Sequence, residues 1–310
     1  MCIRCVHRPY DAWGVVIRLL VVFFTGASHA QIFVVNQGSG TIGKYSLSGQ
    51  VIAPSFISGL QNPTGMAIAG DNLFIAQENG IIKQYTTSGA LVDAALITGL
   101  YFPIGLAVDS GYLYVANAGG PSSTVGKYTL SGAVVNASLI SGLGNPTGLA
   151  LAGDRLYVSE WNNGRVGVYT TSGGIVNPSL IQGLIYPGGL AVDGQGVLFV
   201  SSYDRVGEYT TSGGAVNPSL ISGGYNSAVG IALDGNGHLY WANNYGGEGG
   251  NRIGLYTTAG EVLNATFITG LHNPVAMVVV PDPTAFVLFG MAGVVIYVLV
   301  FRGRRQGAGR

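Results

Sequence analysis

The sequence predicts an all-β fold, a six-bladed β-propeller, on the strength of three observations. A hydrophobic triplet that first appears at Ile32 occurs six times, at intervals of 40 to 43 residues. Each interval holds four short apolar runs separated by Gly, Pro, Asn or Ser, and contains no amphipathic helical stretch. The chain is also rich in glycine (51 residues) and poor in charge (9%). Four short strands in a repeat of about 40 residues are typical of a propeller blade.

The triplet marks the second strand of each expected blade, counted from the central channel outward. Its copies are Ile32-Phe33-Val34, Leu73-Phe74-Ile75, Leu113-Tyr114-Val115, Leu156-Tyr157-Val158, Leu198-Phe199-Val200 and Leu239-Tyr240-Trp241. Each copy is followed by a tyrosine that precedes Ser or Thr and a turn of small residues: Tyr45, Tyr85, Tyr128, Tyr169, Tyr209 and Tyr256. We expect the tyrosines to pack between blades and the turns to be hairpins between the third and fourth strands.

The two ends of the repeat region predict how the ring closes. The region begins at Ile32 with a second strand and completes the third and fourth strands by Leu60. Five full blades then begin near Pro63, Pro103, Pro146, Pro187 and Ala228. One innermost strand, residues 274–279, is left over at the end. Pairing it with the three N-terminal strands completes a sixth blade and removes two exposed sheet edges.

Residues 1–30 have the pattern of a signal peptide. Positive charge comes from Arg4, Arg8 and Arg18, residues 19–24 form the apolar centre, and Ser28-His29-Ala30 offers a small-x-small cleavage site. The chain's two cysteines, Cys2 and Cys5, lie within this segment, ahead of its apolar centre. Cleavage would therefore leave a body, residues 31–280, that is free of cysteine.

The C-terminus, residues 281–310, has the pattern of a membrane anchor. Pro281-Asp282-Pro283 precedes an uninterrupted apolar run at 285–301, and Arg302, Arg304 and Arg305 follow it. The run is close to the minimum of about 17 residues that spans a bilayer as a helix. Arginines behind such a helix stay in the cytoplasm, which places the propeller on the outer side and residues 306–310 at the cytoplasmic end.

This tail (281–305) resembles the PEP-CTERM sorting signal of Gram-negative bacteria, which combines a Pro-Glu-Pro motif, a membrane helix and an arginine cluster. The resemblance implies an exosortase-type processing enzyme as a partner and an association with exopolysaccharide. Asp282 stands where the family usually has glutamate. The substitution keeps the carboxylate but leaves open whether the tail is cleaved.

The body resembles the NHL family of propeller repeats. The sharpest copy, residues 146–169, has a Pro-x-Gly start, the triplet Leu156-Tyr157-Val158 and an Asn-x-Arg-Val hairpin. The hairpin arginine is present in three copies, as Arg165, Arg205 and Arg252. The resemblance covers almost all of residues 31–280 and implies the same six-bladed fold.

The distribution of charge argues against nucleic-acid binding. Residues 31–280 hold seven Lys and Arg against twelve Asp and Glu, a net charge of −5, and the basic residues form no stripe. The two terminal signals predict an exported protein of the cell envelope or extracellular matrix. Its C-terminal helix would anchor it, at least transiently, in the inner membrane.

The loops that join the second strand to the third, and one blade to the next, share one face, which the tail predicts to point outward. Rigid aromatics and amides on these loops suit neutral, hydroxyl-rich ligands such as glycans. The candidate ligand-binding residues are Trp161, Asn162, Tyr203, Tyr245, Tyr101, Tyr186 and His272. A purely structural reading stays open, because Asn is a common turn residue and aromatics pack between blades.

The rival hypothesis is a metal-dependent lactonase- or lyase-like enzyme. Propellers of that class hold a divalent metal at the channel mouth. The equivalent positions here are Asn36, Gln77, Asn117, Glu160, Ser202 and Asn243, a ring with one carboxylate. Calcium takes about six to eight oxygen ligands, so only a weak site at Glu160 with Asn117 is conceivable. We expect no other cofactor and assign no catalytic residue.

The leading functional hypothesis is thus a non-catalytic surface module that binds or organises extracellular polysaccharide or protein. The enzyme is the alternative, and a purely structural role is a third possibility.

Overall fold

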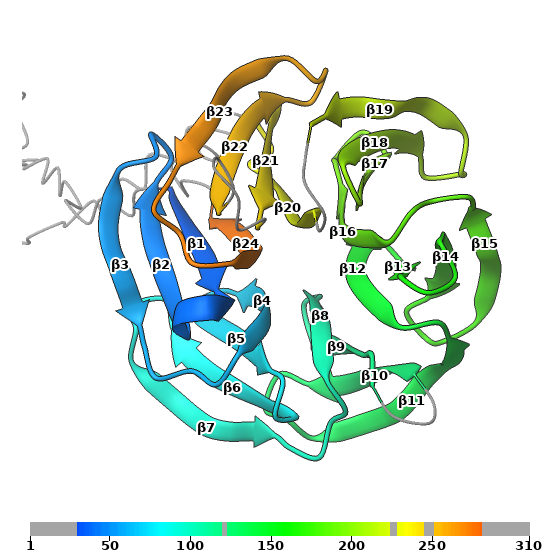
Figure 1. Cartoon of the computed structure of the whole chain (residues 1–310). Coiled ribbons are helices and arrows are strands. Elements are labelled where there is room, and N and C mark those ends of the chain that lie inside the picture. The colour runs from blue at the N-terminus through cyan, green and yellow to red at the C-terminus, as the bar shows by residue number, and fades with distance from the viewer. Residues whose placement is uncertain (1–29, 120–122, 224–227, 245–250, 281–310) are drawn as a thin grey trace, which may run out of the picture. The chain divides into compact units, whose positions relative to one another are not determined.

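The computed structural model describes residues 30–119, 123–223, 228–244 and 251–280. These ranges contain six antiparallel sheets of four strands each, arranged around a central axis (Figure 1). The all-β, six-bladed prediction is therefore confirmed. Nearly all of the predicted signal peptide, the sorting motif with its arginines, and Tyr245 lie outside the described residues. Within the described ranges, no helix is both long enough and apolar enough to cross a membrane.

The innermost strands begin at the predicted positions. They are β4 (Pro63–Ala69), β8 (Pro103–Val108), β12 (Pro146–Ala152), β16 (Pro187–Val192), β20 (Ala228–Leu233) and β24 (Pro274–Val280). The second strands all contain the hydrophobic triplet. They are β1 (Gln31–Asn36), β5 (Asn72–Gln77), β9 (Tyr112–Asn117), β13 (Arg155–Glu160), β17 (Val197–Ser202) and β21 (His238–Asn243).

The third strands all contain the repeated tyrosine. They are β2 (Thr41–Ser46), β6 (Ile81–Thr86), β10 (Ser123–Thr129), β14 (Arg165–Thr170), β18 (Arg205–Thr210) and β22 (Arg252–Thr257). The outer strands are β3 (Val51–Ile57), β7 (Leu91–Ile97), β11 (Val134–Leu143), β15 (Ile175–Ile181), β19 (Ala215–Ser222) and β23 (Val262–Ile268). One turn of 3-10 helix, η1 (Gln37–Ser39), follows β1.

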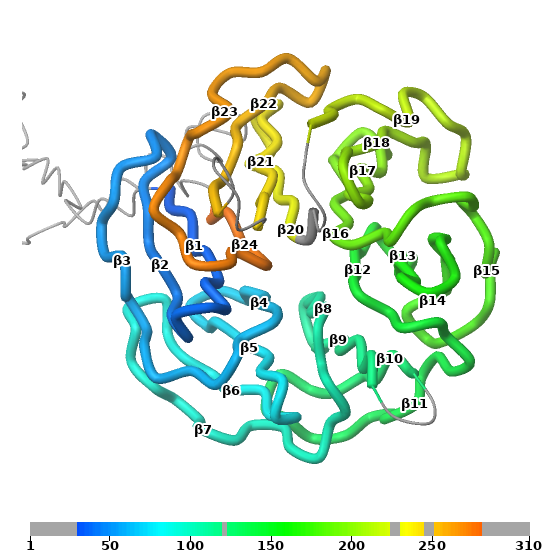
Figure 2. Tube along the Cα trace, viewed as in Figure 1, coloured from blue at the N-terminus to red at the C-terminus, as the bar shows by residue number. Residues whose placement is uncertain are grey.

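The ring closes as the sequence predicts. The sheet that contains the first strands has the order β24-β1-β2-β3, and Gln31 to Val35 pair antiparallel with Val280 to Ala276. Figure 2 shows the C-terminal strand of the described chain lying beside the N-terminal one. The same blade also closes the ring at its periphery, because Gly49 of its outer hairpin abuts Phe267 of the last blade.

The core consists of six hydrophobic clusters, each lying between two adjacent blades. Every cluster contains the repeated tyrosine of one blade and triplet residues of the blade before it, as Tyr169 packs with Tyr114. All six tyrosines are buried, and burial raises the pKa of their hydroxyls. The expected packing of these rings between blades is confirmed, and the repeat therefore encodes the contact between neighbouring blades.

The glycine of the Pro-x-Gly segment permits the inner strands to converge on the axis. A Cβ on Gly65 would collide with the carbonyl oxygen of Ile104, which belongs to the inner strand of the next blade. Glycine is the residue that allows such a close approach of two backbones. Proline in turn is tolerated at the first position of a strand, where no ladder hydrogen bond is lost.

The outer strands contain bulges and local turns that hinder edge-to-edge pairing with another sheet. In β15 the ladder skips residues between Asn177 and Ile181, and Asn177 Oδ1 accepts the N–H of Ser179 at 3.1 Å. The same local turn forms at Asp93, Asn136, Asn217 and Asn264. Bulges of this kind, together with Pro178, interrupt the row of free backbone groups that an edge strand would otherwise offer.

Asp109 closes the hairpin between β8 and β9. Its Oδ1 accepts the N–H groups of Gly111 (2.9 Å) and Tyr112 (2.7 Å), and its Oδ2 accepts the Tyr114 hydroxyl (3.0 Å). Burial by itself raises the pKa of Asp109, but these hydrogen bonds and the nearby Lys127 outweigh it and hold the pKa below its usual range.

This lowered pKa predicts a loss of stability in acid. A carboxyl with a depressed folded-state pKa stabilises the fold above its unfolded pKa of about 3.9, and the contribution disappears as the pH falls through the folded value. We expect Asp109→Asn to be less stable than the wild type at pH 7, and the difference to shrink below about pH 4. Denaturant midpoints of both proteins across pH 2–7 check this, and a difference that is constant with pH would contradict it.

Candidate functional site

The second strand of each blade ends on the face that also carries the linkers between blades. Its last residue is buried in all six blades, at Asn36, Gln77, Asn117, Glu160, Ser202 and Asn243. In three blades this side chain accepts a backbone N–H of the linker: Gln61 to Gln77 Oε1 (2.7 Å), Gly144 to Glu160 Oε2 (2.7 Å) and His272 to Asn36 Oδ1 (3.4 Å). In these three blades the buried polar side chain therefore fixes the linker to the end of the second strand.

Glu160 is fully buried, and both of its carboxylate oxygens are bonded. Arg165 donates to it from Nε (2.6 Å) and Nη2 (3.0 Å), Asn163 donates from Nδ2 (2.6 Å), and Gly144 donates its N–H. The hydrogen bonds from Arg165 to Glu160 raise the pKa of the guanidinium. A cation at this place would have to displace these donors and approach the arginine.

The surroundings of Glu160 therefore do not fit a calcium site. Asn117, its proposed companion, donates from Nδ2 to Thr124 Oγ1 at 3.4 Å, and its Oδ1 is buried with no hydrogen-bond partner in the described part of the chain. Nor do the described residues contain a group of three or more His, Cys, Asp or Glu side chains that could hold a metal ion.

Three of the predicted ligand-binding residues form a row of aromatic rings on this face. Trp161 stacks on Tyr186 with ring centroids 4.9 Å apart and an interplanar angle of 21°. Tyr203 continues the row at 6.1 Å from Tyr186, tilted by 54°. Tyr186 and Tyr203 are 47% and 37% exposed. We call Trp161, Tyr186 and Tyr203 the aromatic row.

Backbone hydrogen bonds hold the aromatic row in place. Trp161 lies in the turn after β13, and its N–H donates to the carbonyl of Asn145 at 3.0 Å. Tyr203 lies in the turn after β17, and its N–H donates in the same way to Ile185 at 3.0 Å. Each turn is thus bonded to the linker of its own blade, and Tyr186 brings the two blades' aromatics together.

Tyr186 adopts a backbone conformation that is unusual for an aromatic residue. The residue before the first proline of an inner strand has a positive φ at Asn62, Phe102, Asn145, Tyr186 and Asn273. Three blades have asparagine at this position, and asparagine tolerates the left-handed region. Phe102 (φ 47°) and Tyr186 (φ 49°) adopt the same left-handed conformation at an energetic cost. Both aromatics are exposed, at 42% and 47%. The cost is not recovered by burial, which makes these two positions candidates for a functional role.

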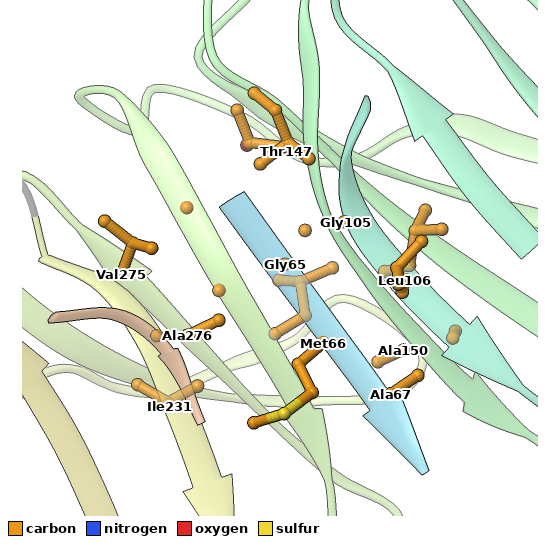
Figure 3. A pocket seen from close by; sticks show the side chains of 18 of the residues that line it. Gly65, Met66, Ala67, Gly105, Leu106, Thr147, Ala150, Ile231, Val275 and Ala276 are labelled. Atoms are coloured by element: carbon orange, nitrogen blue, oxygen red, sulfur yellow. The ribbon is translucent and has the colours of Figure 1, made fainter. Parts of the chain in front are cut away.

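A cavity of about 650 Å³ lies on the axis, next to the aromatic row. Figure 3 shows Met66, Leu106, Ala150, Ile231 and Val275 around it, on inner strands of five blades. The described residues that line the cavity include no titratable side chain. Two hydroxyls come from inner strands, at Thr64 and Thr147. The other polar and aromatic groups lie outside the strands: Gln37, Phe102, Asn145, Trp161 and Asn244.

The other predicted site residues are placed less closely together. Asn162 is exposed beside Trp161, and its N–H donates to the Gly144 carbonyl at 3.0 Å. Tyr101 is 64% exposed and His272 is exposed, each on the linker of another blade. Within the described residues neither makes a ring contact with the aromatic row. Phe102 and Ile185, both exposed on the same face, were not predicted as site residues, although each directly neighbours a predicted tyrosine.

Comparison with solved structures places this fold among known propellers. A chain of the nidogen/laminin complex is similar over 81% of this chain and 98% of its own length, with a TM-score of 0.68 and 15% identity. A gluconolactonase from Xanthomonas campestris matches over 69% and 79% (TM-score 0.58, 16% identity). A streptogramin B lyase matches over 80% and 76% (TM-score 0.56, 20% identity). Identities this low show a shared fold. No protein-family model matches the sequence, and no curated protein does.

Proposed function

We propose that this protein is an exported cell-envelope protein whose propeller is a non-catalytic module that binds a neutral, hydroxyl-rich polymer, namely an extracellular polysaccharide. The observation that carries the proposal is the aromatic row beside the channel mouth. Rigid aromatic rings offer large apolar faces to sugar C–H groups, and neighbouring amides supply the hydrogen bonds that fix orientation. A protein ligand is the other class that such a surface can bind.

The groups around the aromatic row match this ligand chemistry. Asn162 is exposed next to Trp161, and Gln37, Asn145 and Asn244 line the mouth of the cavity. All four carry amides, which both donate and accept hydrogen bonds. The ion pair of Glu160 with Arg165 is internal, so it presents little net charge to a ligand. A neutral polyhydroxylated chain suits this surface better than a charged one.

The strained residue Tyr186 provides the test. We expect Tyr186→Asn to reduce retention on immobilised neutral biofilm polysaccharide severalfold. The melting temperature should fall by less than about 2–4 °C, because relief of left-handed strain offsets part of the lost stacking of about 1 kcal/mol. Asparagine already occupies this position in three other blades.

Tyr112→Asn is the matched control. Tyr112 is 38% exposed and begins a second strand, so it lies on the opposite face of the propeller. Its replacement should leave retention unchanged. Equal retention of the wild type and both variants would refute the assignment of the binding face.

The terminal segments support the cellular part of the proposal. Residues 1–30 would direct export, and the tail at 281–305 would hold the protein in the inner membrane until an exosortase-type enzyme acts on it. The destination is then the outer surface or the extracellular matrix, where polysaccharide is available.

The alternative function is a metal-dependent lactonase- or lyase-like enzyme. The fold that this chain shares with a gluconolactonase and a streptogramin B lyase is the reason to consider it. It is the weaker proposal, because the carboxylate at the channel mouth is bonded to Arg165, Asn163 and Gly144. A calcium-dependent rise in melting temperature that Glu160→Gln abolishes would favour it.

A further inference from the structure

Exposed aliphatic residues form a second feature with six-fold repetition. Every outer strand begins with a pair of exposed aliphatic residues, or with one such residue next to an exposed alanine. The pairs are at 51–52, 91–92, 134–135, 175–176, 215–216 and 262–263, and we call them the outer aliphatic ring. The large members are between 47% (Val176) and 72% (Ile175) exposed. Their repetition in all six blades separates them from scattered surface residues, which need no explanation.

Strand register places this ring on the face opposite the aromatic row. In the closing blade Val51 pairs with Tyr45, Tyr45 pairs with Ile32, and Ile32 pairs with Val279. Val279 is the penultimate residue of β24. The ring is therefore level with the point at which the chain leaves the propeller towards the apolar run at 285–301. The four residues 281–284 between them can span at most about 14 Å.

The segments that carry the ring are almost free of charge. Residues 46–52, 86–92, 129–135, 170–176, 210–216 and 257–263 contain one charged residue, Glu261. The rest are hydroxyl-bearing, small or apolar, apart from Gln50. The turns between first and second strands, on the same face, carry Asp71, Asp109, Asp154, Asp193 and Asp234. Cationic partners offset part of this charge, since Arg155 lies 3.5 Å from Asp154, His238 lies 2.7 Å from Asp234, and Lys127 is near Asp109. The five aspartates and Glu261 still outnumber Arg155 and Lys127, and this excess of carboxylates repels anionic groups near that face.

We propose that the outer aliphatic ring rests on a lipid bilayer with electrically neutral headgroups, so that the propeller lies flat on the membrane and the aromatic row faces away from it. Shallow insertion of aliphatic side chains at a bilayer surface is favourable in proportion to the apolar area buried. Pairing with another sheet is opposed by the bulged outer strands. This orientation requires the predicted membrane tail, but it does not depend on whether the aromatic row binds a polysaccharide.

The test compares two isoleucines on opposite faces. In the full chain with Cys2→Ser and Cys5→Ser, a single cysteine replaces either Ile175 (72% exposed) or Ile185 (56% exposed) and carries a small fluorophore. The protein is reconstituted into phosphatidylcholine vesicles that contain a nitroxide headgroup quencher. A third variant, Val51→Cys, samples a different blade of the ring.

We expect strong quenching at residues 175 and 51 and little at 185. Quenching at only one of the two ring positions would mean that the propeller does not lie flat, and would overturn the proposal. Equal quenching at 175 and 185, or none at any position, would also overturn it. Replacing a third of the phosphatidylcholine with phosphatidylglycerol should weaken the quenching at 175 and 51, and stronger quenching would contradict the neutral-headgroup assignment.

Discussion

Replacing Gly65 by alanine is expected to destabilise the propeller by about 3 kcal/mol or more, since the added Cβ meets the backbone carbonyl of Ile104 in the next inner strand. A flexible side chain could rotate away, but this neighbour is backbone in a closed ring of six blades. The inner strands must separate locally, and a shift at one blade boundary propagates to the others. The corresponding fall in melting temperature is roughly 6–12 °C.

Gly111→Ala is the control for this prediction. A Cβ on Gly111 would meet no atom within 4 Å, and Gly111 does not have the positive φ that would strain an alanine. Its replacement should change the free energy of unfolding by no more than about 0.5 kcal/mol. Urea denaturation of both variants checks the contrast. If Gly65→Ala matched Gly111→Ala, close approach of the inner strands would not be what the Pro-x-Gly segment provides.

Removing the partner of Glu160 is expected to have the other large effect. Arg165→Met leaves a fully buried carboxylate with only the neutral donors Asn163 and Gly144. Breaking a buried ion pair by removing one partner costs about 3–5 kcal/mol. The double variant Glu160→Gln/Arg165→Met should recover most of the loss, because glutamine already occupies the equivalent position in another blade, at Gln77.

Arg205→Met is the matched control for Arg165→Met. Arg205 is likewise the first residue of a third strand, but its partner Asp204 is 39% exposed. Exposed pairs contribute about 0–1 kcal/mol, so this variant should be nearly as stable as the wild type. Urea denaturation measures the loss of stability in both arginine variants. Similar losses would show that the burial of Glu160 does not determine how much its ion pair contributes to stability.

The fold could be predicted almost completely from the sequence because each blade repeats one set of local rules. Pro63 and its equivalents mark where inner strands begin, the triplet at Leu73 marks the second strand, and Tyr85 marks the third. Closure followed from counting strands, and the pairing of β1 with β24 confirms it. These features depend on the backbone conformation of single residues and on which side chains are buried along a short strand. Both leave a direct pattern in the sequence.

The candidate site could be predicted only in part. The stacking of Trp161 on Tyr186 joins two blades, and its geometry depends on how far their loops are separated. The positive φ of Tyr186 has no signature in the residue itself, although asparagine at the same position in other blades is a hint. The bonding of Glu160 to Arg165 could have been found from the hairpin register, which pairs the two residues. Exposure of the outer aliphatic ring depends on how blades diverge at the periphery.

We propose that the face with the aromatic row binds polysaccharide without breaking its bonds and without a metal ion. The most direct measurement is retention of the full-length protein on immobilised neutral biofilm polysaccharide after treatment with EDTA, combined with chain-length analysis of the polymer afterwards. We predict retention equal to that in calcium, and polymer of unchanged length. Loss of retention that calcium restores, or shortening of the polymer, would contradict metal-free, non-catalytic binding and favour the enzyme.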